Sequence, residues 1–378
     1  PSGTFSAKIE LTENYNSVLA VYSSNSATPT FAQLIPVAQS FDYHGFTDSR
    51  YRVKFFAEAG KHYFIAVAGN NSNNATPEGN FQLKWGVNRL RYSADYERYD
   101  DNSAISVFRP SDGGWYSVYS FTSGLTSSLQ WGKSGDTPVA ADYDGNGSTD
   151  IAVARNENGV KNWYIRNAVG ISGLTWGLAT DKAITGDYDG DGRADVGVMR
   201  LTANGYAWYI RQSSNGAMRS FLFGTTGDNP VFGDFDGDGM TEVAVVRNTP
   251  NGMVWYMLKS STNYTQFSAQ QFGTTPDVPT AEDYDGDGRT DIAIFRPSTG
   301  YWYILQSSNG ALDYKVFGGN GDKPQPADYD GDGKADVGVF RPSNGTWYIL
   351  RSGNGQPIIR QWGAATDIPV SSMTTLSQ

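Results

Sequence analysis

The sequence predicts an all-β protein whose larger part is a β-propeller, and three observations support this prediction. The 378 residues include 10 Trp, 23 Tyr, 19 Phe and 44 Gly, a composition typical of short strands joined by tight turns. No long stretch has the 3.6-residue apolar period of a helix. A pattern of about 45 residues recurs along most of the chain, which is the length of one four-stranded propeller blade.

Five acidic loops define this repeat. Each has Asp at its first and third positions, Asp or Asn at the fifth, Gly at the fourth and sixth, and Asp or Glu at the ninth. The first positions follow one another at intervals of 45, 47, 49 and 45 residues. The loops span residues 142–150, 187–195, 234–242, 283–291 and 328–336.

Each repeat contains the same strands in the same order. A brief apolar segment precedes the acidic loop, and an apolar strand such as residues 292–296 follows it. After a turn comes a Trp-Tyr strand such as residues 301–305, then an Asn-Gly hairpin signal and a last strand that ends in an aromatic-Gly pair. Six Trp-Tyr strands occur, with Trp at positions 115, 163, 208, 255, 302 and 347.

Six Trp-Tyr strands predict six blades, with seven as the alternative if another segment supplies one. The first repeat has a degenerate loop, residues 95–101, without the glycines or the spacing. At the other end of the chain, Met373 stands where a first loop Asp is expected. We therefore expect the C-terminal strand to complete a blade that begins near Arg91, which would close the ring and remove exposed sheet edges.

Residues 1–88 do not follow the repeat. They contain alternating strand-like segments, such as residues 18–22, 51–55 and 63–67, separated by loops rich in Asn, Ser, Pro and Gly. A jelly-roll or β-sandwich of this size is plausible, so the sequence predicts two domains, residues 1–88 and 89–378.

The acidic loops have the composition of calcium sites. Calcium takes six to eight hard oxygen ligands, and the glycines let the backbone coil around an ion. An EF-hand is excluded, since it needs a 12-residue loop between helices. We expect about five structural Ca²⁺ ions, whose summed charge would offset the formal charge of −10. The predicted ligands are Asp142, Asp144, Asn146, Asp150, Asp187, Asp189, Asp191, Asp195, Asp234, Asp236, Asp238, Glu242, Asp283, Asp285, Asp287, Asp291, Asp328, Asp330, Asp332 and Asp336.

From about residue 90 onward, the recurring loop, Arg-Pro turn and Trp-Tyr strand resemble the FG-GAP/VCBS repeats of bacterial surface and secreted proteins, which are related to the integrin α-subunit propeller. That resemblance implies calcium at the blade edges and a role in adhesion or glycan binding. Residues 3–86, through segments 59–67 and 79–85, are similar to the pre-peptidase C-terminal (PPC) domain. The second resemblance implies an accessory module of an exported enzyme.

Composition also excludes several functions. The chain has no Cys, so disulfides and zinc-thiolate sites are absent, and its acidic balance argues against a nucleic-acid partner. No apolar run is long enough to cross a membrane, and no signal-peptide pattern begins at Pro1, so an exported protein would be in its mature form.

Catalytic signals are few. The two histidines, His44 and His62, lie outside the repeats, and no nucleophile elbow or metalloprotease motif occurs. Glu157, Glu282 and Asp313 remain as acids outside the loop pattern. A lyase that uses Tyr and Arg stays open.

Three sets of recurring or exposed side chains are candidates for ligand contact. The Trp-Tyr pairs favour core packing between blades over sugar stacking. The better lectin candidates are Tyr206, Tyr264 and Tyr314, which lie outside the repeated positions. One Arg per repeat could ring a face, but we favour a role in bracing each blade. These arginines are Arg109, Arg155, Arg200, Arg247, Arg296 and Arg341.

The sequence therefore predicts a non-catalytic, calcium-stabilised binding or structural module, secreted or at the cell surface by bacterial-type export. The expected partner is a glycan or an extracellular protein, without nucleic-acid binding or membrane insertion. One alternative is a polysaccharide-degrading lyase or hydrolase with its site on a propeller face. Another is a self-assembling surface or filament protein.

Overall fold

The computed structural model describes residues 4–12, 17–24, 28, 35–40, 50–58, 62–69, 82–88, 103–118, 126–167 and 170–370. Across these ranges the chain is all-β, as predicted, with one short 3₁₀ helix, η2 (Ser260–Thr262). The chain divides into two compact units at residues 90 and 91. The degenerate loop 95–101, His44 and Met373 lie outside the described residues.

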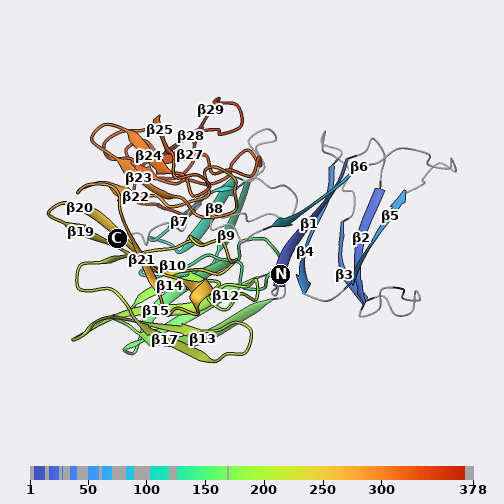
Figure 1. Cartoon of the computed structure of the whole chain (residues 1–378), viewed down its shortest axis with the longest axis horizontal. Helices are drawn as coiled ribbons and strands as arrows, with labels where there is room; N and C mark the ends of the chain where they lie inside the picture. The colour runs from blue at the N-terminus through green and yellow to red at the C-terminus, as the bar shows by residue number, and fades with distance from the viewer. Residues whose placement is uncertain are drawn as a thin grey trace. The chain divides into compact units, whose positions relative to one another are not determined.

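The N-terminal unit is a β-sandwich of two antiparallel, three-stranded sheets (Figure 1). Register is continuous where β1 pairs with β4 and β6, whereas β2 and β3 pair with one irregularity after Val21. One sheet has the order β4 (Arg50–Glu58), β1 (Thr4–Thr12), β6 (Gln82–Asn88); the other has β3 (Ile35–Ser40), β2 (Ser17–Ser24), β5 (His62–Gly69).

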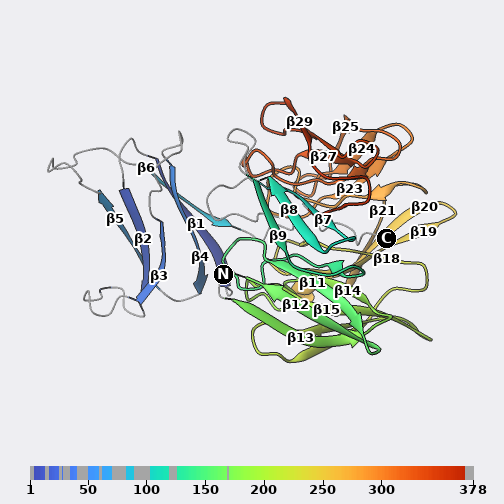
Figure 2. The same ribbon diagram turned by 180° about the vertical axis from the view of Figure 1, so that it is seen from behind.

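The second unit contains six four-stranded antiparallel sheets, which are the blades of a propeller (Figures 1 and 2). The prediction of six blades is confirmed, and the seven-bladed alternative does not hold for residues 103–118, 126–167 and 170–370. Blade 1 is β30 (Ile368–Pro369), β7 (Ile105–Arg109), β8 (Gly114–Val118), β9 (Thr126–Gln130); blade 2 is β10 (Thr137–Pro138), β11 (Ile151–Glu157), β12 (Val160–Arg166), β13 (Ile171–Leu178); blade 3 is β14 (Lys182–Gly186), β15 (Asp195–Thr202), β16 (Gly205–Arg211), β17 (Met218–Leu222); blade 4 is β18 (Asn229–Val231), β19 (Val243–Thr249), β20 (Gly252–Leu258), β21 (Phe267–Gln271); blade 5 is β22 (Val278–Pro279), β23 (Ile292–Arg296), β24 (Tyr301–Leu305), β25 (Leu312–Val316); blade 6 is β26 (Lys323–Pro324), β27 (Val337–Arg341), β28 (Thr346–Leu350), β29 (Pro357–Gln361).

The ring closes through blade 1, as predicted. Strand β30 from the C-terminal end pairs with β7, so that Ile368 lies opposite Phe108. Two further bonds cross the junction with blade 6: the Trp362 indole N–H donates to the Tyr116 carbonyl at 3.2 Å, and the Ser103 amide donates to the Asp328 carbonyl at 2.6 Å. The C-terminal strand therefore completes blade 1 and covers the edge that β7 would otherwise expose.

The residue types in each strand of a blade match how deeply that strand is buried. The second strand is almost wholly apolar because neighbouring blades cover both of its faces, as in β23, and the third strand carries the Trp that enters the core. All six of these Trp side chains are at most 1% exposed. Each indole N–H donates to the carbonyl of the aromatic residue near the C-terminal end of the fourth strand. Core packing, not sugar stacking, is therefore the role of these Trp side chains. The pairs are Trp115–Trp131, Trp163–Trp176, Trp208–Phe223, Trp255–Phe272, Trp302–Phe317 and Trp347–Trp362.

The turn between the second and third strands needs a glycine. In blade 5, Gly300 has a φ of +71°, and a Cβ there would lie 2.5 Å from the Gly318 carbonyl oxygen. The close approach lets the Phe317 amide donate to the Gly300 carbonyl at 2.8 Å. Any side chain at this position would separate the turn from the end of the fourth strand.

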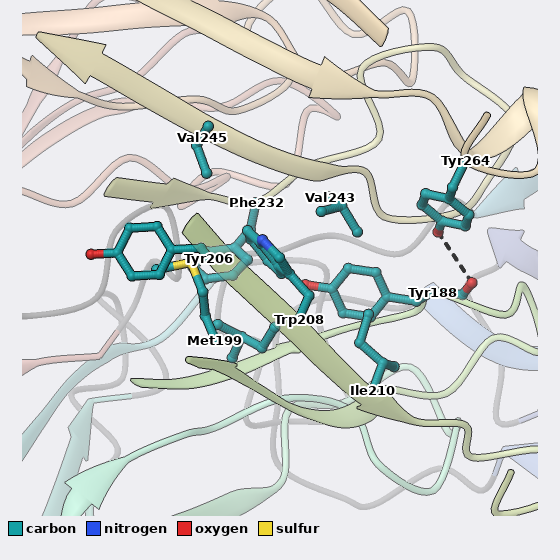
Figure 3. Close-up of a cluster of buried hydrophobic side chains, with 10 residues drawn as sticks. Tyr188, Met199, Tyr206, Trp208, Ile210, Phe232, Val243, Val245 and Tyr264 are labelled. Carbon is teal, nitrogen blue, oxygen red and sulfur yellow. Dashed lines mark hydrogen bonds between the residues drawn. The ribbon is translucent and has the colours of Figure 1, made fainter. Parts of the chain in front are cut away.

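Blades 3 and 4 share a core in which Tyr264 occupies a special place (Figure 3). Its side chain is 6% exposed, and its hydroxyl donates to the carbonyls of Tyr188, at 3.1 Å, and Thr241, at 2.7 Å. Tyr206 is also buried, at 8% exposed. The interpretation of Tyr206 and Tyr264 as lectin contacts is therefore wrong, because both rings are enclosed by the core, whereas Tyr314 is 61% exposed and remains a candidate.

Replacing Tyr264 by Phe is expected to destabilise the propeller by about 1–3 kcal/mol, since two buried carbonyls lose their hydroxyl donor while the ring stays in place. Urea unfolding measures the difference. The matched change Tyr314→Phe, at an exposed ring, should alter the free energy of unfolding by no more than about 0.5 kcal/mol. Equal effects of the two changes would contradict the role assigned to the Tyr264 hydroxyl.

Candidate metal centres

Each acidic loop connects the first strand of a blade to the second, and in each the carboxylates converge. Five clusters bring at least three acids together, so that one oxygen of each lies within 4.8 Å of the others. These clusters can hold a metal ion. They are Asp142, Asp144 and Asp150; Asp187, Asp189 and Asp195; Asp234, Asp236, Asp238 and Glu242; Asp283, Asp285 and Asp291; and Asp328, Asp330 and Asp332.

Backbone amides within the loop hold the first and ninth acids in place. In blade 3, Asp187 accepts the Gly190 amide at 2.7 Å and the Gly192 amide at 2.9 Å. The ninth acid, Asp195, accepts the Tyr188 amide at 2.9 Å. This pattern coils the loop around the point where the carboxylates meet.

The loops also link neighbouring blades. In each case the residue before the ninth acid donates its amide to the carbonyl of the first Asp in the preceding loop. These bonds join Ala194 to Asp142, Thr241 to Asp187, Thr290 to Asp234 and Ala335 to Asp283, at 2.6–2.8 Å. An ion in one loop would therefore stabilise a joint between two blades as well as a turn.

Three of the predicted carboxylate ligands fall outside these clusters. Asp191 and Asp287 pair instead with the nearby arginines Arg193, at 2.6 Å, and Arg289, at 3.0 Å. Asp336 accepts the Tyr329 amide at 2.8 Å, as Asp195 accepts the Tyr188 amide in blade 3, and the nearby Asp330 carboxylate raises its pKa. Asn146 has no carboxylate to contribute, so blade 2 has a three-acid loop.

Blade 1 differs from the other five. Ala104, which is 2% exposed, immediately precedes β7 and stands where the other blades have the ninth acid. A cation site of the same type would lack the buried acid that anchors the loop. The expectation of about five sites rather than six is consistent with this residue.

Burial raises the pKa of the ninth acid in every acidic loop, and the nearby third-position carboxylate raises it further. The pKa reaches about 8 for Asp150 and Glu242, about 7 for Asp195 and Asp336, and about 6 for Asp291. Carboxyls in this state need either a proton or a cation beside them.

The donor set fits a hard cation. Every side-chain group in the five clusters is a carboxylate, the ligand type that calcium and magnesium prefer. In blade 4, Asp236 Oδ1 is buried and has no hydrogen-bond partner among the described residues, although its other oxygen accepts the Ser261 hydroxyl at 2.6 Å. A bound ion would satisfy that oxygen.

These pKa values give a pH dependence for the protein without metal. The acids bind protons more tightly folded than unfolded, where their pKa is about 4, so their stabilising contribution is complete below pH 4 and is lost as the pH rises through 6 to 8. In chelator, the melting temperature is expected to fall between pH 5 and pH 8. Calorimetry at several pH values tests this, and a flat profile in chelator would contradict it.

The recurring arginines each form a two-bond ion pair with an aspartate that the sequence reasoning missed. In blade 5, Arg296 Nε and Nη2 each donate to Asp277 at 2.8 Å, and the guanidinium lies 4.9 Å from the Tyr303 ring centroid. The arginines brace their blades, as favoured, but through an acid outside the loops. The pairs are Arg109–Asp367, Arg155–Asp136, Arg200–Asp181, Arg247–Asp228, Arg296–Asp277 and Arg341–Asp322.

The three acids that the sequence left without a role, Glu157, Glu282 and Asp313, each contact neighbouring protein groups. Glu157 accepts the Tyr164 hydroxyl at 3.1 Å, and this bond, together with Asn162 and Arg155, lowers its pKa. Asp313 pairs with Lys315 at 2.8 Å on the surface. Glu282 is 6% exposed, and its backbone forms an isolated antiparallel β-bridge with that of Asp291. A lowered pKa does not suit Glu157 to donate a proton in glycoside cleavage.

Across the described residues, no helix has the length and apolar character that crossing a membrane requires.

Comparison with solved structures finds matches of low sequence identity and low TM-score. A streptogramin B lyase structure is 10% identical with a TM-score of 0.41, over 72% of this chain and 87% of the other. TolB from Acinetobacter baumannii is 11% identical with a TM-score of 0.49, over 71% and 66%. An auxiliary nutrient binding protein from Bacteroides ovatus is 10% identical with a TM-score of 0.39, over 93% and 91%.

The comparison with curated proteins returns no match. The model of the FG-GAP-like repeat matches three overlapping segments, residues 187–245, 234–294 and 283–339, each of which runs from one acidic loop into or beyond the next. The six-bladed propeller of this chain therefore contains three FG-GAP-like repeats.

Proposed function

We propose that this chain is a non-catalytic, calcium-stabilised module that binds a glycan or a protein outside the cell. The FG-GAP-like repeats and the five acidic clusters support calcium as the stabilising ion. The repeated Trp and Arg side chains serve the scaffold, which leaves recognition to surfaces on which the blades differ. Secretion by bacterial-type export and the PPC-like nature of residues 1–88 belong to the same proposal.

The observation that carries a binding role is an apolar surface on blade 5. Its outer strand exposes Leu312, Tyr314 and Val316, each more than half exposed. Cross-strand pairing places Tyr303 opposite Tyr314. The Tyr301 and Tyr303 rings stack at 5.6 Å between centroids. Aromatic faces of this kind suit contact with sugar rings or with apolar side chains.

A glycan array paired with assays for reducing sugar and unsaturated product tests the proposal. Binding without product, lost in Tyr314→Ala and retained in Tyr264→Phe, supports a binding module that uses blade 5. Product formation abolished by a single surface substitution would replace it with the enzyme alternative. Growth of particles with protein concentration in light scattering would favour self-assembly.

A further inference from the structure

In blades 3 to 6, the hairpin between the third and fourth strands contacts the acidic loop of the same blade. The loop precedes the second strand and the hairpin follows the third. Both therefore lie at the same end of an antiparallel blade. The hairpins were interpreted from the sequence only as turns. Their serines do more than shape a turn.

Blade 5 shows the contacts. The Ser307 amide donates to Asp291 Oδ1 at 2.6 Å, and the Ser307 hydroxyl donates to Asp287 Oδ1 at 3.0 Å. The Ser308 hydroxyl donates to Asp285 Oδ2 at 2.6 Å. Two adjacent hairpin residues thus hold the third, fifth and ninth acids of the loop.

The same contacts recur in three other blades. In blade 3, Ser213 bonds Asp195 and Asp191, and Ser214 bonds Asp189 at 2.6 Å. In blade 4, Ser260 bonds Glu242 and Asp238, and Ser261 bonds Asp236 at 2.6 Å. In blade 6, Ser352 bonds Asp336 and Asp332, but Gly353 offers only its amide to Asp330, at 3.3 Å.

Blade 2 provides an internal comparison. Its loop has Asn146 at the fifth position. Arg166 pairs with Ile151 as Leu305 pairs with Ile292. In the sequence, Ala168 and Val169, which lie outside the described residues, follow Arg166 at the distance at which Ser307 and Ser308 follow Leu305. The hydroxyls therefore occur where the fifth position is Asp and are absent where it is Asn. A serine hydroxyl donor is therefore present in the blades that carry a carboxylate at the fifth loop position.

We propose that the hairpin serines are positioning residues for the cation. They fix the third carboxylate, which belongs to every cluster, and the fifth, which belongs to the clusters of blades 4 and 6, before the ion binds. The inference rests on the proposed calcium binding. A carboxylate held by a hydroxyl loses less rotational freedom when it binds an ion, and partners of this kind commonly change metal affinity by about 10–100-fold. Blade 6, with one hydroxyl fewer, should have a weaker site than blades 3 to 5.

Gly353→Ser tests the inference by adding the missing hydroxyl. A Cβ at this position would lie 3.0 Å from Asp330 Oδ2 and 2.9 Å from Asp332 Oδ2, which are the movable ends of side chains. Calorimetric titration of the metal-free protein with Ca²⁺ is expected to show one site tightened about tenfold. The matched control Gly353→Ala adds the Cβ without the hydroxyl and should not tighten the site.

The converse change is Ser307→Ala with Ser308→Ala, which should weaken one Ca²⁺ site about tenfold or more, while the exposed Ser298→Ala in the same blade leaves all sites unchanged. Equal titrations for Gly353→Ser and Gly353→Ala would overturn the inference. So would a double Ala variant that lowers the melting temperature equally with and without Ca²⁺. A parent protein that binds no Ca²⁺ would instead overturn the proposed function.

Discussion

Removing the proposed calcium ions with a chelator is expected to lower the melting temperature of the propeller by on the order of 20 °C at neutral pH. An ion that binds only the folded chain stabilises it by mass action, by about 2.7 kcal/mol at a free concentration 100 times the dissociation constant. Five clusters contribute, and the ninth acids of their loops are almost completely buried. Without the ions, each of these carboxyls must take up a proton or remain charged beside the other carboxylates of its own cluster.

Differential scanning calorimetry with and without chelator measures this effect, and metal analysis confirms removal. Added Ca²⁺ should restore the original melting temperature. Chelator already saturated with Ca²⁺ is the control, since it should change nothing. An unchanged melting temperature after verified metal removal would contradict a structural role for the ion.

The variant Asp285→Ala should bind about one ion fewer than the parent, because one cluster loses a ligand.

Much of the propeller could be predicted because its determinants are local and repeated. The 45-residue interval, the turn glycines and the Trp-Tyr strand each specify a short segment, and repetition turns weak signals into a strong one. The convergence of the acids could also be predicted from the loop sequence alone. The glycines allow the backbone to turn tightly, and the closely spaced carboxylates lie on that one turn. No pairing between distant residues needs to be known.

The arginine partners were missed because they depend on register between strands. Asp277 lies 19 residues before Arg296, and the pair meets only because β22 and β23 align Val278 with Phe295. A sequence signal did exist, since an Asp follows each aromatic-Gly pair at a fixed distance. The loop acids are more numerous and closer to the arginines in the sequence. They therefore offered a competing prediction of which carboxylates the arginines contact.

Tyr264 was misinterpreted for a related reason. It lies within the 49-residue interval, the longest between two acidic loops, and its place outside the repeated positions suggested a ligand contact. The turn instead places Asn263 and Tyr264 at φ values of +55° and +58° and directs the ring into the core of blades 3 and 4. Whether an inserted aromatic is exposed depends on the space beside it, which the repeat pattern does not describe.

Replacing Arg296 by Ala is expected to destabilise the propeller by about 3–5 kcal/mol, because Asp277 keeps its charge but loses its partner. The Asp277 side chain is 1% exposed, and Arg296 supplies two of its hydrogen bonds. The surface pair Lys315–Asp313, with side chains 46% and 40% exposed, is the matched control in the same blade. Lys315→Ala should cost at most about 1 kcal/mol.

Two further variants separate the causes. Asp277→Ala combined with Arg296→Ala should be less destabilising than the sum of the single changes, since it leaves no unpaired charge. Arg296→Lys should also be destabilising, because an ammonium lacks the planar pair of donors that matches a carboxylate and cannot stack on Tyr303 as the guanidinium does. If the six arginines instead formed a binding ring for an acidic polysaccharide, Arg296→Ala would reduce binding and leave urea unfolding nearly unchanged. Paired Arg and Asp geometry in every blade argues for the first outcome.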